Sequence, residues 1–217
     1  MRNVATVLML GTLWPQGSAG GEVSKASISV LVFDYAGVPA EILSVGLIET
    51  KRILGSGGVE AVWIHCPVAP ERLSLERLSL ERRCRDTPGP LTLVLQILPP
   101  AATRLRTEPG AGGFAVSPTD GSFGTYAGVF HGRIKQLGKS IGEAAALGHV
   151  VAHELGHLLL GTGRHSAGGI MKPDWDHKQI VLAEQGLLRF DSGQRVRIQD
   201  NIRRRLMASK GRLPESR

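Results

Sequence analysis

The segment His153-Glu154-Leu155-Gly156-His157 constrains this chain most, because it places two histidines four residues apart inside an apolar, proline-free run. Residues at this spacing share one face of an α-helix, with Cβ atoms about 5–6 Å apart. Two imidazoles so placed can bind a single metal ion, with a glutamate carboxylate beside them. The pattern therefore predicts a helix that carries two zinc ligands and a general base.

The residues around this motif favour a helix with a third ligand beyond its end. Ile141 to Val151 contains recurring apolar residues and no proline, and Leu158 to Leu160 continue the apolar run. Gly161 offers a stop, since glycine tolerates the left-handed conformation that ends many helices. His165 follows within a short glycine-containing loop, so we expect it to complete a three-histidine site.

Composition indicates a folded domain rather than a disordered chain. The 217 residues are 42% hydrophobic and 21% charged, which is enough apolar material for a core. The formal net charge is +7, with arginines concentrated near the C-terminus. That segment has no interleaved aromatic residues, so we interpret it as the solvated face of a helix and expect no nucleic-acid partner. Binding of DNA or RNA there stays as a weaker hypothesis.

Residues 1–20 have the pattern of a secretory signal peptide. Arg2 precedes an uncharged, mostly apolar run from Val4 to Trp14, which is too short to span a membrane. Ser18-Ala19-Gly20 then offers a small-residue cleavage site. We therefore expect a secreted or periplasmic protein without stable membrane insertion after cleavage.

The two cysteines, Cys66 and Cys84, predict one disulfide, because an even count in an exported chain favours pairing. A bridge of this span contributes about 3 kcal/mol in the chain-entropy model. Between them the pentamer at 73–77 is repeated at 78–82. We interpret the repeat as a surface excursion whose base the disulfide holds.

The pattern of apolar residues predicts an α+β fold. A helix from Pro39 to Gly55 separates the first two strands, and the histidine-bearing helix follows the last strand. Two further helical segments are expected near His177–Leu188 and Ser192–Ala208. The expected strands are Ile28–Tyr35, Val59–Ile64, Leu91–Leu98, Gly113–Ser117 and Tyr126–Phe130.

The motif, the glycine turn, His165-Ser166 and Gly169-Ile170-Met171 together resemble the metzincin clan of zinc peptidases, and its matrixin-like branch in particular. The likeness covers residues 149–175 by motif, and about 27–210 by expected order of elements. It implies a zincin-like fold, in which a twisted mixed sheet of about five strands packs on two helices and precedes a small, mainly helical lobe. Residues 21–217 would form one catalytic domain, with an upper lobe at 27–161 and a lower lobe at 162–210.

The resemblance also implies the parts of an active site. His153, His157 and His165 would bind one zinc ion. Glu154 would act as general base on a zinc-bound water in peptide-bond hydrolysis. Met171 would form the turn beneath the metal. The implied protein is a monomeric secreted metallopeptidase that acts on peptides or proteins.

A substrate-binding edge is implied as well. An edge strand presents unpaired backbone groups that can pair with an extended peptide. Trp175 would line the pocket for the residue after the scissile bond. The strand residues concerned are Gly113, Phe114, Ala115 and Val116.

One departure from the clan pattern leaves alternatives open. Gly161 and His165 follow His157 through a connection two residues longer than usual. Glu184, on an expected helix, could replace His165 and give a gluzincin-type site of two histidines and one glutamate. Asp174 and Asp176 are weaker candidates, which could instead orient a ligand imidazole. A zinc-stabilised binding or scaffold protein without turnover is the alternative to an enzyme.

Overall fold

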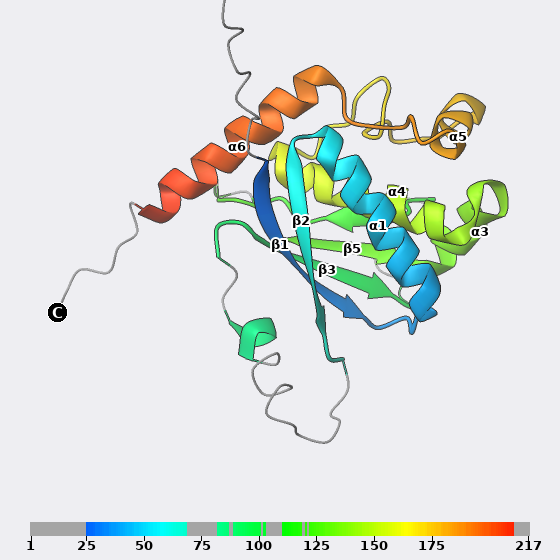
Figure 1. Ribbon diagram of the computed structural model, residues 1–217, viewed down its shortest axis with the longest axis horizontal. Coiled ribbons are helices and arrows are strands. Elements are labelled where there is room, and N and C mark those ends of the chain that lie inside the picture. The colour runs from blue at the N-terminus through cyan, green and yellow to red at the C-terminus, as the bar shows by residue number, and fades with distance from the viewer. Residues whose placement is uncertain are drawn as a thin grey trace, which may run out of the picture.

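The computed structural model describes residues 25–68, 82–86, 89–100, 102, 110–118, 120 and 122–210. The expected signal peptide and all but the last residue of the duplicated pentamer lie outside these ranges. Within them the chain has the expected α+β fold, built on one five-stranded mixed sheet (Figure 1).

The strand order in the sheet is β2-β1-β3-β5-β4. The first four strands in this order run parallel to their neighbours, whereas β4 pairs antiparallel with β5. The short strand β4 is therefore an edge, with one side of its backbone unpaired within the sheet. The bounds are β1 Ala26–Asp34, β2 Val59–Cys66, β3 Thr92–Leu98, β4 Gly113–Ala115 and β5 Tyr126–Phe130.

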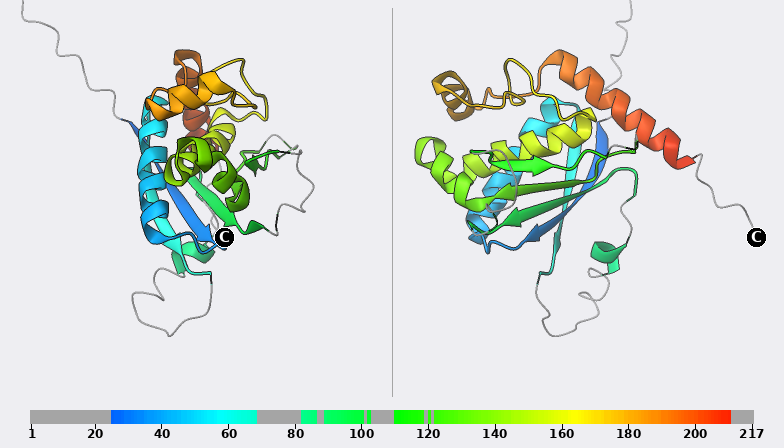
Figure 2. Two further views of the ribbon diagram at one scale, coloured as in Figure 1. Left: turned by 90° about the vertical axis from the view of Figure 1, so that its right-hand side faces the viewer. Right: turned by 180° about the vertical axis from the view of Figure 1, so that it is seen from behind.

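Two long helices cover one face of this sheet and pack against each other (Figure 2). Helix α1 spans Ala40–Ser56 and connects β1 to β2, and α4 spans Glu143–Leu160. From Ala146 to Leu160 every residue of α4 is buried. A helix that is apolar on all sides has to lie inside the molecule. The motif helix is thus part of the core and is held rigidly.

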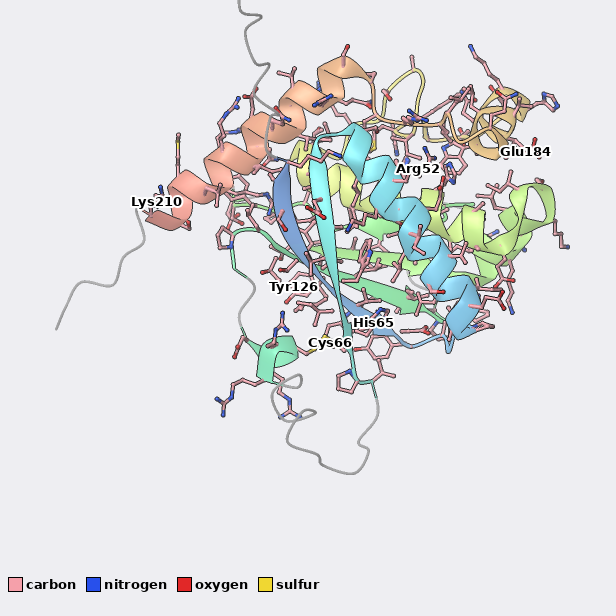
Figure 3. All side chains as sticks on the ribbon, viewed as in Figure 1. Arg52, His65, Cys66, Tyr126, Glu184 and Lys210 are labelled. Atoms are coloured by element: carbon pink, nitrogen blue, oxygen red, sulfur yellow. A yellow bond between two sulfur atoms is a disulfide. The ribbon has the colours of Figure 1, made fainter. Side chains whose placement is uncertain are left out.

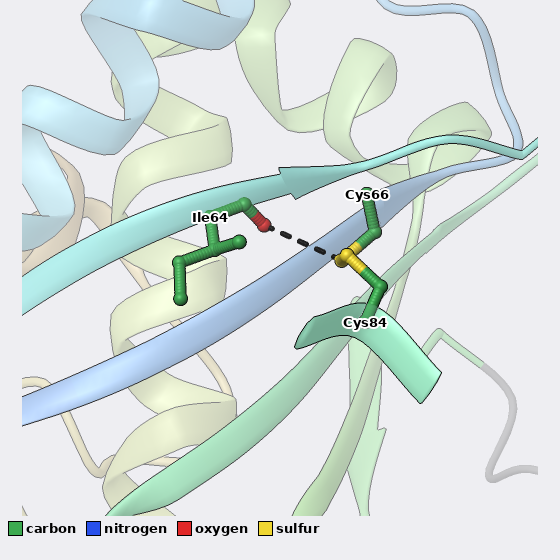
Figure 4. The surroundings of a disulfide bond; sticks show 3 residues. All are labelled: Ile64, Cys66 and Cys84. Carbon is green, nitrogen blue, oxygen red and sulfur yellow. Dashed lines mark hydrogen bonds between the residues drawn. A yellow bond between two sulfur atoms is a disulfide. The ribbon is translucent and has the colours of Figure 1, made fainter. Parts of the chain in front are cut away.

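The opposite face of the sheet carries the disulfide. Leu31, Ile64 and Val94 form a small apolar cluster there, against which Cys84 packs. Cys66 and Cys84 are bonded, with Cα atoms 5.8 Å apart, so the predicted disulfide is confirmed (Figure 4). A helical turn at 82–85 bears Cys84. A disulfide persists in an oxidising compartment, which agrees with an extracellular-type environment.

The expected motif helix is present, but it starts at Glu143 rather than at Ile141. Helix α3 spans His131–Ile141 and ends where the motif helix was expected to begin. Gly142 separates the two helices with a φ of 84°, which turns the chain between them. His131 Nε2 lies 2.7 Å from Glu143 Oε1 and joins the start of α3 to the start of α4. This extra helix stands at one end of the motif helix.

The remaining helices are α5, His177–Glu184, and α6, Ser192–Lys210. Helix α6 lies across the end of the molecule where β1 begins (Figure 1). No helix in the described ranges is long and apolar enough to cross a membrane.

Arg205 on α6 is an exception to the expected solvated face, since its side chain is only 2% exposed. Its Nη2 donates to the carbonyls of Leu158, at 2.7 Å, and Gly124, at 2.8 Å. Its guanidinium also lies 4.9 Å from the ring centroid of Phe123. Burial lowers the pKa of Arg205 to about 10. This cation joins α6 to the carboxyl end of α4, where the helix dipole favours positive charge.

Candidate metal centre

Helix α4 places three side chains of the motif on one buried face. His153, Glu154 and His157 are 8%, 6% and 6% exposed. Gly161 ends the helix with a φ of 65°, as the sequence predicts, and its N–H bonds to the His157 carbonyl. The chain then turns back toward the face that carries these residues.

Backbone carbonyls fix the orientation of both helix histidines. His153 Nδ1 lies 2.7 Å from the Ile170 oxygen, and His157 Nδ1 lies 3.1 Å from the Thr162 oxygen. A carbonyl only accepts hydrogen bonds, so each Nδ1 is the protonated donor and each Nε2 keeps a free lone pair. This is the arrangement that orients metal-ligating histidines.

The third histidine comes from the loop. His165 is exposed, yet its ring centroid lies 5.3 Å from that of His153 and 4.9 Å from that of His157. One ligand nitrogen from each of the three rings lies within 4.8 Å of the other two. The structure thus brings together the three residues that the sequence predicts as ligands, close enough to bind one metal ion.

The donor set fits a metal ion. His153 Nε2 and His157 Nε2 are 3.1 Å apart, close to the roughly 3.3 Å that tetrahedral geometry with Zn–N near 2.0–2.1 Å requires. Two lone pairs held this close repel each other unless a cation or proton lies between them. Burial lowers the pKa of His153 to about 4 and lowers that of His157, so both rings are held in the neutral, ligating form.

The turn at Met171 lies directly beneath the motif helix. Met171 is fully buried, and its carbonyl accepts a bond from the Ser166 N–H at 2.9 Å. A Cβ added at Gly156 would meet Met171 Sδ at 2.6 Å and the Phe190 ring at 2.9 Å. The glycine inside the helix is therefore needed for close packing of this turn, which also supplies the Ile170 carbonyl to His153.

Glu154 lies between the metal centre and the edge strand. Burial raises the pKa of its carboxyl to about 8. A Cβ at Gly113 would meet Glu154 Cγ at 2.7 Å and the Gly128 oxygen at 2.5 Å. Only a glycine in β4 allows the edge strand to approach this carboxylate so closely.

The three histidines and Glu154 line a cleft of about 800 Å³. Of the residues predicted to bind substrate, Gly113, Phe114, Ala115 and Trp175 line it. Val116 lies just beyond β4, is 48% exposed and is not among the lining residues. The cleft thus runs along β4 and reaches the three clustered histidines.

Trp175 is held from two sides. Its Nε1 donates to the Lys172 carbonyl at 3.1 Å, and its ring meets the edge of His149 with centroids 5.8 Å apart. His149 is fully buried and donates from Nδ1 to the Ala145 carbonyl at 2.8 Å. It acts as a hydrogen-bonded helix residue that supports the wall of the cleft.

None of the alternative carboxylates belongs to the three-histidine group. Glu184 is exposed at the end of α5 (Figure 3) and does not belong to the three-histidine group. Asp176 accepts bonds from the backbone N–H groups of Lys178 and Gln179, so it caps α5. Asp174 lines the cleft and is exposed. The two helix histidines are oriented by carbonyls instead.

Sequence reasoning missed the contribution of α3. Arg133, Gln136 and Leu137 of this helix line the cleft. The apolar spacing of Ile134, Leu137 and Ile141 was a signal for this helix, although two glycines weaken it.

Compared with known proteins, the sequence matches no family model and no curated protein. Its function has to be inferred from the geometry of the site.

Proposed function

We propose that this protein is a secreted zinc metallopeptidase of the zincin-like fold, in the matrixin-like part of the metzincin clan. The observation that carries this proposal is the convergence of three imidazoles beside a buried carboxylate in one cleft. Neutral imidazoles are ligands that suit zinc. Three protein ligands with a further position open toward a cleft are typical of catalytic rather than structural zinc sites.

The chemistry divides between the metal and the chain. A bound zinc ion would lower the pKa of water and polarise a substrate carbonyl. Glu154, close to the site and shielded from solvent, would accept the proton of the attacking water and pass it to the leaving amine.

The edge of the sheet would hold the substrate. An extended peptide can pair with the free side of β4, which brings its carbonyl carbon toward Glu154. Met171 and the turn around it support the histidines from below. The confirmed disulfide and the signal-like residues 1–20 support export, to the periplasm or the medium.

The test compares Glu154→Gln with the matched variant Glu184→Gln. Both remove one carboxylate, but Glu184 is exposed on α5 away from the histidines. Glu154→Gln should keep one zinc ion per chain and lose peptide cleavage by about a hundredfold or more. Glu184→Gln should keep both. Zinc content is measured by elemental analysis, and cleavage by mass spectrometry of a peptide library.

Three outcomes would contradict the proposal. Unchanged cleavage in Glu154→Gln would remove the mechanism. Full zinc occupancy in the wild type with no cleaved peptide would favour a zinc-stabilised scaffold protein. Loss of zinc in Glu184→Gln would revive the gluzincin-type site.

A further inference from the structure

The cleft has an end at α3 that the metal centre does not use. Helix α3 contributes Arg133 and Leu137 to the lining of the cleft, which also includes Trp175. We propose that Arg133 is a specificity residue that binds a carboxylate of the substrate just downstream of the scissile bond. The inference rests on the proposed peptidase function and assigns the substrate class of that site.

The direction of the strands places this end downstream. Strand β5 runs toward α3, because Phe130 is followed at once by His131. Strand β4 runs the opposite way, so Gly112 and Gly113 lie nearer to α3 than Ala115 does. A peptide pairing antiparallel with β4, the more stable of the two pairings, runs in the direction of β5. Its residues after the scissile bond therefore point toward α3.

The distance suits the first downstream residue. Val150 lines the cleft beside Gly112, at the α3 end of the edge strand, and lies about one helical turn before His153 on α4. One turn of helix advances about 5.4 Å, which is within the reach of one side chain. The apolar surfaces of Leu137 and Trp175 would enclose the stem of that side chain, with the guanidinium at its end.

Arg133 has no competing acid in the described part of the chain. It is the single lysine or arginine among the residues that line the cleft. Within the described residues its only polar contact is a long one, from Nη1 to the neutral Gln136 Oε1 at 3.4 Å. Asp174 also lines the cleft, but no ion pair joins it to Arg133 within the described residues. The guanidinium fork is thus free for a bidentate carboxylate.

Helix α3 presents this arginine from a rigid support. Ile134 is fully buried beside it, and His131 bonds to Glu143 at the start of α4. A guanidinium on an anchored helix loses less conformational freedom on binding than one on a loop. Arg133 is therefore placed to discriminate between substrates rather than only to attract them.

Two kinds of substrate offer the required carboxylate. One is an acidic side chain on the residue after the scissile bond. The other is the terminal carboxylate of a chain that ends at that residue. A peptide set separates them by carrying Glu, Gln or Lys at this position, and by carrying Ala there as a free acid or as an amide.

Cleavage rates for this set are compared in wild type, Arg133→Gln and the matched control Lys135→Gln. Lys135 is exposed on the same helix outside the cleft lining, so its removal changes net charge equally. Wild type and Lys135→Gln should prefer one carboxylate form about tenfold or more, as expected for a charge-assisted pair. Arg133→Gln should lose this preference while still cleaving the neutral peptides. Equal ratios in Arg133→Gln and wild type, or a wild-type preference for Lys, would overturn the inference.

A binding measurement separates the two hypotheses. The zinc-loaded Glu154→Gln variant is titrated with the same peptides, with and without Arg133→Gln, and the change in tryptophan fluorescence reports binding. Carboxylate binding that depends on Arg133, without cleavage by the wild type, would refute the peptidase and leave Arg133 as a carboxylate-binding residue of a cleft without turnover. Cleavage with no dependence of binding on Arg133 would keep the peptidase and refute the inference.

Discussion

The metal centre has two unequal halves. His153 and His157 lie on a core helix, are buried, and each donates a hydrogen bond to a fixed carbonyl. His165 lies on the surface, in a loop that starts at Gly161 and contains Gly163. No atom lies within 4 Å of a Cβ built at Gly163, whereas one built at Gly156 would meet Met171. One half is close-packed and the other is loosely surrounded.

This difference shows how His165 can still reach the two helix histidines, although the loop that carries it is two residues longer than in the metzincin pattern that the motif resembles. The helix half fixes the direction in which two lone pairs point, so the metal position is set before the loop contributes. The loop then has to bring a single donor to that position. Two additional residues in the loop are tolerated because few contacts depend on its course.

The largest expected effect is the loss of zinc affinity when one proposed ligand is removed, either from the helix or from the loop. Loss of one ligand should weaken zinc binding by about a hundredfold or more. His153→Ala should weaken binding more than His165→Ala, because the exposed position of His165 can be taken by water. Zinc affinity is measured by competition with a chromophoric chelator. Equal losses in the two variants would show that the loop is as well organised as the helix.

A second effect concerns the pH dependence of stability of the zinc-free protein, to which the buried Glu154 carboxyl contributes. Glu154 has a folded pKa of about 8, against 4.5 for the unconstrained group. Between these values the folded state holds a proton that the unfolded state has released, so stability falls as pH rises. Glu154→Gln lacks this penalty and should become more stable than the wild type from pH 5 to pH 9. The stability of both proteins is measured as unfolding midpoints in the presence of a chelator. A difference in stability between the two proteins that stays constant from pH 5 to pH 9 would contradict the expectation.

A third experiment compares the packing of the two halves directly. Gly156→Ala inserts a methyl group against Met171 and Phe190 and should destabilise the fold by about 1–3 kcal/mol. Gly163→Ala meets nothing within 4 Å and should be neutral or stabilise by about 0.4–1 kcal/mol. Chemical denaturation of both variants measures the difference. A stability loss in Gly163→Ala equal to that in Gly156→Ala would show that the loop is packed.

The smallest effect should come from loosening the loop alone. Ser166 Oγ donates to the Gly168 carbonyl at 2.7 Å and accepts from Gln194 Nε2 at 3.1 Å, which links the loop to α6. Ser166→Ala should cost about 0.5–1.5 kcal/mol of stability and weaken zinc binding only a few-fold. Ser209→Ala is the control, because that exposed hydroxyl bonds only to Leu206 on its own helix. A larger loss of zinc than in His165→Ala would contradict this ranking.

Local patterns in the sequence were enough to predict the elements with strong periodicity. Tyr126–Phe130 is a strand within the predicted bounds, and Gly161 ends the motif helix as expected. The cluster of His153, His157 and His165 followed from residue spacing and the chemistry of imidazole. These features depend on interactions between near neighbours in the chain, which the sequence displays directly.

Other features depend on contacts that leave no such signal. The carbonyls of Ile170 and Thr162 orient the histidines, and a backbone group can belong to any residue. Helix α3 was missed because Gly132 and Gly138 lower its intrinsic propensity, and its docking on α4 outweighs this. The closeness of β4 to Glu154 needed the sheet order, which follows from the packing of the whole domain.

The contact of Arg205 with Leu158 has a consequence for the order in which the protein folds during synthesis. The carbonyl at the end of the motif helix is satisfied by a residue that follows all three histidines in the chain. A nascent chain that already contains the whole metal site still lacks this partner. Stable closure of the helix end therefore waits for α6, so the helix that carries His153 and His157 reaches its final packing only after α6 has been synthesised and docked.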